Sequence, residues 1–374
     1  MNLDSALKPV LAVAAEHAPA VDADGRFPEE AVSALGESGL LGLTIPAREG
    51  GPGAGPREFA HVAAELAAVC GSTAMVYLMH VCGAMTVLAA PPPALPALAA
   101  GLATGRTLAT LAFSEPGSRS HFWAPVSQAK RNGGEDVRFT ADKSWVTSAG
   151  HAGLYVTSVL SADEPGTVDL YAIEADRPGV SVTGSFRGLG LRGNASAPMR
   201  FEVTAPDPTR LGPAGTGLAL MTDTVMPWFN LGNAAVSLGL ARAALEAAVR
   251  HTSSARLEHT GQTLAELPTI RARLARMSLQ LEAASAYMRR AAESIAAPDE
   301  QTPLHVLGVK ALANDTALAV TDDAMRVCGG AAFSNHLAIE RFFRDARAGH
   351  VMAPTADALY DFYGKAITGQ PVFG

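Results

Sequence analysis

The sequence predicts an α+β fold in which a strand-rich middle unit separates two helical units. Three observations carry this prediction: helical apolar spacing near the start, short β-rich segments bounded by turn residues in the middle, and long helical spacing at the end. We expect an N-terminal α-helical domain at 1–108, a middle β domain at 109–212 and a C-terminal α-helical domain at 213–374. A chain of 374 residues can accommodate two or three such units.

The N-terminal unit is predicted to be helical because apolar side chains recur on one helix face. The clearest stripe is Phe59, Val62, Ala63, Leu66 and Val69. Prolines between residues 91 and 96 then predict a loop.

The middle unit is predicted to be a small antiparallel barrel or sandwich, because short β-rich segments follow one another with turn residues between them. The expected strands are Val137–Phe139, Tyr155–Val159, Leu170–Ala172, Val180–Val182 and Met199–Val203.

The C-terminal unit is predicted to contain long helices. One stripe consists of Leu274, Met277, Leu281, Ala284 and Met288. A second stripe consists of Val309, Leu312, Ala313, Thr316 and Val320.

Composition excludes several classes of protein. The net charge of −7 argues against a nucleic-acid binder, which would normally carry a basic face. The three cysteines form no CxxC pair, so neither a disulfide framework nor a structural zinc site is expected. We therefore expect a reduced, cytoplasmic protein. The histidines show no HExxH motif or other metal-ligand spacing. The apolar run Val10–Ala15 stops at Glu16 and the run Val87–Ala90 ends in three prolines, so no membrane span is expected.

Three polar or glycine-rich segments exceed what packing requires. Residues 114–121 combine hydroxyls with a Gly/Pro turn that can form a nest for phosphate oxygens, or an ordinary polar turn. Residues 145–150 place a tryptophan beside hydroxyls, which suits a planar cofactor or a buried strand. Gly329 and Gly330 allow close backbone approach to a ligand or simply end a helix.

Other catalytic motifs are weak or missing. Residues 188–193 match GxGxxG in letters but open no predicted helix, which argues against a dinucleotide-binding Rossmann unit. The sequence contains neither a P-loop nor a G-x-S-x-G nucleophile elbow. The cluster Glu340, Arg341, Arg344 and Asp345 is expected to be a structural ion-pair cluster.

Taken in order, the segments resemble the motifs of the acyl-CoA dehydrogenase family from about Leu41 to about Thr368. The matching elements are Pro46–Gly51, Phe113–Ser120, Trp145–Thr147, the glycines of 188–217, Val327–Gly330 and Arg344–Arg347. The resemblance implies an N-terminal helical domain, a middle β-barrel or sandwich and a C-terminal four-helix domain, assembled as a homodimer or homotetramer. It also implies FAD as cofactor and an acyl thioester of CoA or a carrier protein as substrate.

The resemblance also implies which residues contact FAD, from their positions within the matching motifs. Ser114 and Thr147 would bond the isoalloxazine edge, and Trp145 would pack against the ring. The other implied cofactor positions, toward the diphosphate, the adenine or the catalytic loop, are Ser120, Arg256, Arg326, Gly329, Gly330 and Thr355. Arg256 lies one residue too early for the family's arginine–x–x–phenylalanine–glycine element.

The sequence departs from the family where the catalytic glutamate belongs. Ala353 occupies its usual position on the C-terminal loop, and Phe229 occupies the minority position on the first helix of the C-terminal domain. Asn230 replaces the neighbouring arginine. Candidate replacement bases are His121 and Asp357 first, then Glu115 and His350.

Three functions stay open from sequence. The first is oxidation of the Cα–Cβ bond of an acyl thioester with one of these non-standard bases. The second needs no base, because a β-keto acid that loses CO2 makes its own enolate, or because the enzyme is a flavin-dependent oxidase or monooxygenase of secondary metabolism. The third is a non-catalytic subunit that keeps the fold. The electron acceptor is either an electron-transfer flavoprotein or O2.

Overall fold

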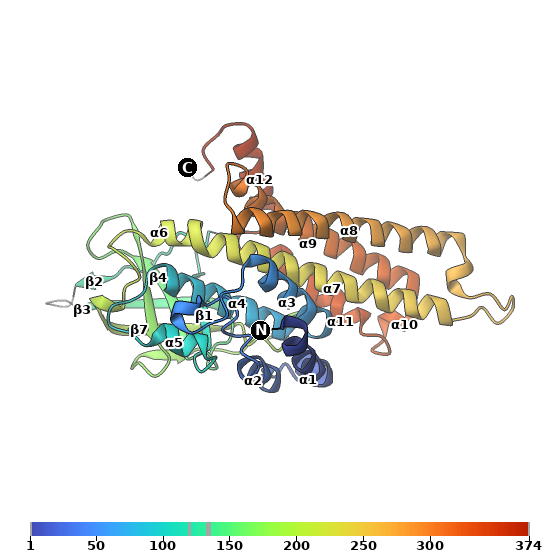
Figure 1. Cartoon of the computed structure of the whole chain (residues 1–374), viewed down its shortest axis with the longest axis horizontal. Coiled ribbons are helices and arrows are strands. Elements are labelled where there is room, and N and C mark those ends of the chain that lie inside the picture. Colours follow the sequence, from blue (N-terminus) through green and yellow to red (C-terminus); the bar gives the residue numbers. More distant parts are fainter. Residues whose placement is uncertain (1, 119–120, 132–135, 373–374) are drawn as a thin grey trace.

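A computed structural model describes residues 2–118, 121–131 and 136–372. A β unit at one end of the molecule joins a set of long helices that extend to the other end, and the N-terminal helices pack along one side (Figure 1). The predicted order of helices, strands and helices is confirmed. The N-terminal helices are α1 Leu3–Asp24, α2 Glu29–Glu37, α3 Pro56–Val69, α4 Gly71–Ala89 and α5 Leu98–Ala103.

Helix α3 carries the stripe predicted from sequence. Pro56 occupies its first position, where a missing N–H costs nothing, and the Glu58 carboxylate accepts the Gly55 N–H at 3.1 Å. Phe59 and Leu66 of the stripe are fully buried. The prolines after residue 90 lie in the loop between α4 and α5, as expected.

Helix α4 is buried on almost every side. Its length and hydropathy would suffice to cross a membrane, but 78% of its apolar window is buried inside the protein. On this helix the buried His80 accepts the Ala109 N–H through Nδ1 and lies 3.0 Å from the Leu41 carbonyl oxygen through Nε2. The neutral imidazole therefore joins α4 to the first strand and to the linker after α2.

Two facing sheets form the middle unit. The strands are β1 Ala109–Ala112, β2 Lys130–Arg131, β3 Asp136–Val146, β4 Leu154–Leu160, β5 Val168–Glu174, β6 Val180–Val182 and β7 Ala197–Pro206. One sheet has the order β1-β4-β5 and the other β2-β3-β7-β6. Buried residues of β3 and β7 alternate with exposed ones and pack against the first sheet.

The expectation of a wholly antiparallel unit is wrong at one pair. Strand β1 runs parallel to β4, with Ala109 opposite Leu154. Between these two strands the chain passes through β2 and β3 of the other sheet, so β4 re-enters the first sheet in the same direction as β1.

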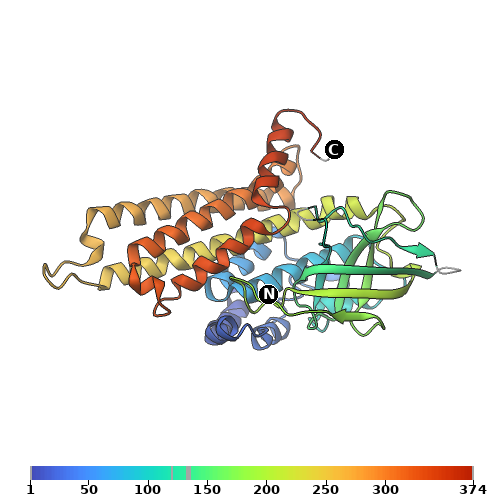
Figure 2. The same cartoon turned by 180° about the vertical axis from the view of Figure 1, so that it is seen from behind.

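Four long helices form the C-terminal bundle. They are α7 Met226–Ser254, α8 Pro268–Ala296, α9 Thr302–Cys328 and α11 Ile339–Val351. The shorter elements are α6 Gly217–Leu220, a π-helical turn at Met221–Val225, α10 Gly330–Phe333 and α12 Ala356–Ile367. Helix α7 packs against both α9 and α3, which fixes the bundle to the N-terminal unit. Helix α12 packs on α9 and projects from the bundle with the C-terminal end (Figures 1 and 2).

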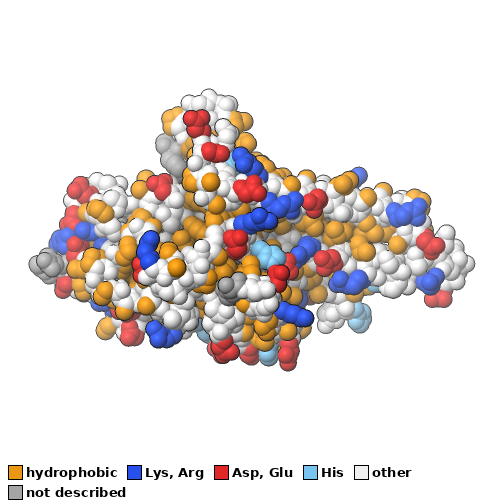
Figure 3. Space-filling view, viewed as in Figure 1, with side chains coloured by type: hydrophobic (Ala, Val, Ile, Leu, Met, Phe, Trp, Pro, Cys, Tyr) orange, Lys and Arg blue, Asp and Glu red, His pale blue; other side chains and the backbone are white. Residues whose placement is uncertain are grey.

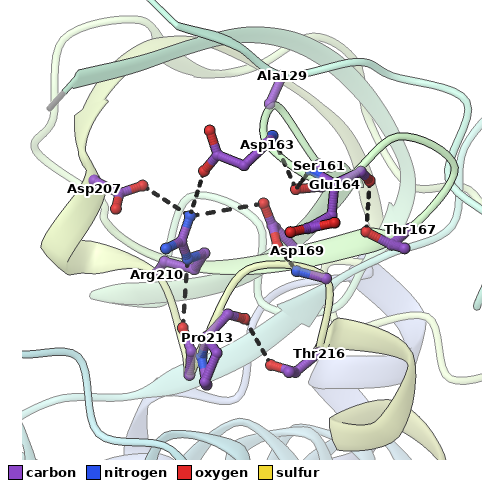
Figure 4. A network of polar contacts seen from close by, with 12 residues as sticks. Ala129, Ser161, Asp163, Glu164, Thr167, Asp169, Asp207, Arg210, Pro213 and Thr216 are labelled. Atoms are coloured by element: carbon purple, nitrogen blue, oxygen red, sulfur yellow. Dashed lines mark hydrogen bonds and ion pairs between the residues drawn. The ribbon is translucent and has the colours of Figure 1, made fainter. Parts of the chain in front are cut away.

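A polar network holds the segment that leads from β7 to α6. Arg210 Nη1 lies 3.1 Å from Asp163 and 2.9 Å from Asp207, and Asp169 accepts the Gly215 N–H at 2.7 Å (Figure 4). Asp169 is buried at the start of β5. The network therefore fixes the direction in which the chain leaves the β unit for the bundle.

Acidic and basic side chains are interspersed on the surface. On the face drawn in Figure 3, neither sign of charge gathers into one large patch.

Candidate functional site

A cavity of about 840 Å³ lies where the three parts of the chain meet. Helix α4, strand β1, the end of β3, the loop before β7, the start of α7 and the end of α11 each contribute to its wall. The lining is mostly apolar, and its volume lies in the range of ligand-binding cavities. The apolar lining includes Met75, Met79, Leu111, Phe113, Phe122, Phe186, Val225, Phe229 and Met352.

Strand β3 ends in an irregular turn that presents Trp145 to the cavity. The pairing of β3 with β7 shifts between Lys143 and Val146, and Trp145 has a φ of 53°. Its side chain is 69% exposed, which is high for a tryptophan. A positive φ is strained for a large side chain and is typical of sites where function fixes the backbone.

Three further non-glycine residues with a positive φ lie in the cavity lining or next to it in the chain. Ser148 has a φ of 61°, and Leu191 and Ala195 each have a φ of 49°. The Ser148 N–H donates to the Asn194 carbonyl, so the two strained segments bond to each other. Backbone strain at four non-glycine residues in or next to the cavity lining supports the assignment of this cavity as a functional site.

Hydroxyl groups line the same side of the cavity. Ser114 is half-buried, and its hydroxyl has no hydrogen-bond partner in the part of the chain that the structure describes. Thr147 is buried, its Oγ1 lies 3.1 Å from Ser196 Oγ, and its carbonyl accepts from Thr110. The site therefore offers a free hydroxyl at Ser114 and a fixed one at Thr147.

Beneath Ser114, a buried ion pair fixes the backbone. Lys143 Nζ lies 2.7 Å from Glu115 Oε1 and also donates to the Phe113 carbonyl. Glu115 Oε2 accepts the Val126 and Ser127 N–H groups at 2.6 and 3.0 Å. Burial lowers the pKa of Lys143 to about 8. Glu115 is fully engaged in this structure and is not free to act as a base.

The glycine-rich loop packs onto α11. A Cβ on Gly190 would lie 2.5 Å from the Arg344 carbonyl carbon, so the approach requires glycine. The Leu191 N–H donates to Asp345 Oδ1 at 2.6 Å, and burial raises the pKa of Asp345 to about 6. As predicted, this loop opens no helix, because it leads into β7.

The predicted ion-pair cluster on α11 is smaller than expected. Arg344 pairs with Glu340 and reaches Asp22 on α1 at 2.6 Å. Asp345 instead accepts the Leu191 N–H, and Arg341 donates to the Val69 carbonyl. Buried backbone donors and acceptors compete with charged groups for these side chains.

The cavity wall offers few titratable groups. Ala353 and Phe229, which the sequence resemblance predicts at the two family positions for the glutamate, both line the cavity. Among the described residues that line it, the charged side chains are Glu115, Arg344 and Arg347. Arg347 lies 3.3 Å from the Phe343 ring centroid and donates to Thr321 Oγ1. Apart from the paired Glu115, this described wall contains neither a carboxylate nor an imidazole.

The structure brings together three of the predicted cofactor residues, Ser114, Trp145 and Thr147, in one cavity wall. The two candidate bases do not line the cavity. His121 is exposed with its ring centroid 5.1 Å from that of Trp123, and Asp357 is exposed in the first turn of α12. The secondary candidate His350 lies on α11, 3.5 Å from Asp315.

The remaining predicted residues lie elsewhere in the chain. Arg256 donates to Gly261 in the loop after α7, and Arg326 lies near Asp322 and Asp323. Gly329 ends α9 with a φ of 55°, and Gly330 begins α10, both exposed. Thr355 accepts the Ala358 N–H as the N-cap of α12. Ser120 lies outside the described residues.

Sequence reasoning missed several lining residues. Ser144, Asn194 and Ser196 supply polar groups, and Met75 and Met79 form an apolar wall from α4. The spacing of the two methionines by one helical turn was a usable signal, because it places both on one face. The three polar residues had no comparable signal, because Ser144 lies at the irregular end of β3 and Asn194 and Ser196 lie in the loop before β7, where side chains follow no regular period.

Comparisons with known proteins agree with this architecture. Three family models match the chain: "Acyl-CoA dehydrogenase, N-terminal domain" at 3–91, the middle domain at 110–204 and the C-terminal domain at 215–367. The chain is 30% identical to "Probable acyl-CoA dehydrogenase FadE25" of Mycobacterium tuberculosis over 344 residues, covering 89% of this chain and 86% of the relative.

Two further proteins are similar along nearly their whole length. A 3-sulfinopropanoyl-CoA desulfinase of Paraburkholderia xenovorans is 28% identical, with 98% of this chain and 95% of the relative covered. The solved structure of butyryl-CoA dehydrogenase from Megasphaera elsdenii has a TM-score of 0.90 at 22% identity, covering 98% of this chain and 99% of that one. At this identity the structural likeness shows the fold alone.

Proposed function

Because the chain belongs to the acyl-CoA dehydrogenase family, we propose that it is an FAD-dependent oxidoreductase that removes two electrons from the Cα–Cβ bond of an acyl thioester without a protein base. The observation that carries the proposal is the described cavity wall, in which Ala353 and Phe229 replace both family carboxylates and the remaining carboxylate, Glu115, is fully paired.

FAD, the cofactor of this family, fits the cavity on observations made in this chain. The exposed Trp145 ring offers an apolar face of the size that a planar ring system covers. The free Ser114 hydroxyl and the fixed Thr147 hydroxyl would bond the edge of that ring system. When bound, FAD supplies a two-electron acceptor for a hydride.

A substrate that carries a carboxylate on Cα needs no base. Its C–CO2⁻ bond breaks, CO2 leaves, and the electron pair stays on Cα as an enolate conjugated with the thioester carbonyl. Departure of a hydride from Cβ then forms the Cα=Cβ double bond, so the products are CO2 and an unsaturated thioester. The substrate therefore gives up CO2 where a typical family member removes a proton.

The chain's own residues favour this route by excluding water. Phe113, Phe229 and Met352 give the cavity an apolar wall. An apolar wall disfavours a carboxylate and favours uncharged CO2, which lowers the barrier to loss of the group. The small Ala353 side chain leaves room where a glutamate would otherwise place a second negative charge.

One relative supports a reaction that begins with loss of a group. The similar protein of Paraburkholderia xenovorans is named a desulfinase of 3-sulfinopropanoyl-CoA, so its name describes removal of a sulfinate group from an acyl-CoA. The similarity to that protein covers 98% of this chain and 95% of the relative. The parallel supports group loss as chemistry that this family scaffold accommodates.

The remaining assignments are part of the same proposal. The thioester handle is CoA or a carrier protein, the electron acceptor is an electron-transfer flavoprotein or O2, and the enzyme is a cytoplasmic homodimer or homotetramer. FAD contacts at Ser120, Arg256, Arg326, Gly329, Gly330 and Thr355 belong to the proposal as well.

An anaerobic titration tests the function with matched thioesters. The purified holoenzyme is mixed in separate titrations with an acyl-CoA and with its 2-carboxy derivative, and the flavin absorbance at about 450 nm is followed. We expect bleaching with the 2-carboxyacyl thioester only. Equal bleaching by the plain acyl thioester would contradict the base-free route and favour a protein base, for which His121 and Asp357 are the candidates.

A further inference from the structure

A buried lysine holds the segment that closes the C-terminal side of the cavity. This wall segment, residues 349–355, ends α11, contains the lining residues Met352 and Ala353, and leads into α12. The last carbonyl groups of a helix have no partners within it, so a segment of this kind needs donors from elsewhere.

Lys310 of α9 supplies those donors. Its Nζ lies 3.0 Å from the Gly349 carbonyl oxygen, 3.0 Å from that of Met352 and 2.7 Å from that of Pro354. An ammonium group has three N–H donors, and three carbonyl groups use all of them. The Lys310 residue is 0% exposed, and no carboxylate in the described part of the chain lies within ion-pair distance of it.

Neighbouring polar groups on α7 and α9 support the same contact. Asn314, one turn after Lys310, donates to the Gly349 carbonyl at 2.8 Å and accepts from Ser237 Oγ at 2.8 Å. A Cβ on Gly349 would lie 2.6 Å from Asn314 Oδ1, so this packing requires glycine. Asn233 donates to the Met352 sulfur at 3.5 Å.

An isolated buried ammonium is costly to desolvate, but an apolar side chain at position 310 would leave the carbonyl groups of Gly349, Met352 and Pro354 without this donor. The ammonium group also fixes the position of the wall segment relative to the cavity. It binds the carbonyls on both sides of Ala353, so it fixes how far Met352 and Ala353 extend into the cavity.

We propose that Lys310 is a positioning residue that fixes the wall segment 349–355 and thereby the shape of the cavity around the reacting part of the substrate. The kinetic part of this proposal rests on the proposed function. The structural part does not, because it concerns how the wall segment is held.

The test compares Lys310→Met with wild-type holoenzyme. Hydrogen exchange of peptides that cover residues 349–356 should become about 10-fold faster or more, while peptides from the middle of α7 keep their protection. The flavin absorption band should shift, and kcat should fall about 10-fold or more with a smaller change in KM, because a displaced wall misplaces the reacting atoms. Asn314→Ala, which removes one supporting donor, should move each readout less in the same direction.

Arg210→Met is the control, because it removes a partly buried polar network of the β unit whose residues do not line the cavity. It should lower stability while leaving the flavin band, KM and kcat unchanged. If Lys310→Met unfolds the protein, the changes that Asn314→Ala causes in hydrogen exchange, the flavin band and kcat test the proposal instead. The proposal is overturned if the variants leave exchange in 349–356 at the wild-type rate, or if they change the flavin band and kcat no more than the control does. If no thioester reacts with the wild type, the proposed function fails. The hydrogen-exchange comparison still tests whether Lys310 holds the wall segment.

Discussion

The Lys143 ammonium lies 2.7 Å from the Glu115 carboxylate, and both side chains are almost completely removed from solvent. This pair joins strand β3 to the segment that carries Ser114. It explains why a carboxylate next to the cavity has no catalytic freedom, and it connects the stability of the β unit to the shape of the site.

Replacement of Lys143 by methionine should therefore destabilise the protein strongly. The change leaves Glu115 buried without its partner, which costs about 3–5 kcal/mol of unfolding free energy. Urea unfolding followed by far-UV circular dichroism measures this loss. The double variant Lys143→Met with Glu115→Gln should recover part of it, and a double variant as unstable as the single one would contradict the pairing argument.

If the proposed base-free route holds, substitution of Ala353 by glutamate should add the ability to remove a Cα proton. A carboxylate at this position would remove a Cα proton, so plain acyl-CoA thioesters that do not reduce the wild-type flavin should reduce that of Ala353→Glu, with a rate gain of about 10²-fold or more. Stopped-flow absorbance under anaerobic conditions measures the rate. Ala353→Gln has the same size without the base and should stay inactive with plain thioesters; equal gains in both variants would exclude a base effect.

The Trp145 position should show opposite effects on stability and on cofactor binding. Trp145→Gly relieves the strain of a φ of 53° and should raise the unfolding free energy of the apoprotein by about 1 kcal/mol. The same change removes the apolar face offered to FAD, so the FAD dissociation constant should rise about 10-fold or more. Thermal unfolding and fluorescence titration with FAD measure the two quantities. Unchanged FAD affinity would remove Trp145 from the cofactor site.

The neutral His80 should make the fold sensitive to acid. Burial lowers the pKa of His80 to about 4, whereas an unfolded histidine has a pKa of about 6.5. The unfolded state therefore binds the proton first, and stability from this group is lost as the pH falls from about 6.5 to 4, by up to about 3 kcal/mol. The measurement is the unfolding free energy of wild type minus that of His80→Gln across this range. A difference that does not change with pH would contradict the assignment.

The helical parts of the fold followed from sequence because their signals are local and repeated. The stripe from Phe59 to Leu66 and the two later stripes each correspond to a helix, α3, α8 and α9. The parallel pairing of β1 with β4 did not follow, because pairing direction depends on the route of the chain between sheets and not on the residues of either strand.

The sequence grouped residues that share the cavity wall only where a motif specified both the residue type and its position. The prediction grouped Ser114, Trp145 and Thr147, and all three lie in one cavity wall. His121 and Asp357 were chosen by residue type near a motif, and residue type does not determine where a side chain points. The role of Lys310 gave no sequence signal, because its three partners are backbone carbonyls 39 to 44 residues away in the chain.

The most direct test of the base-free route is the amount of CO2 released in a single anaerobic turnover. The wild-type holoenzyme is mixed with a 2-carboxyacyl-CoA labelled with ¹⁴C at the carboxyl group, and the released label is compared with the flavin reduced. The account predicts one CO2 for each FAD reduced, with both appearing at the same rate. Flavin reduction without release of label would show that the Cα–Cβ bond is oxidised by another route and would contradict the account.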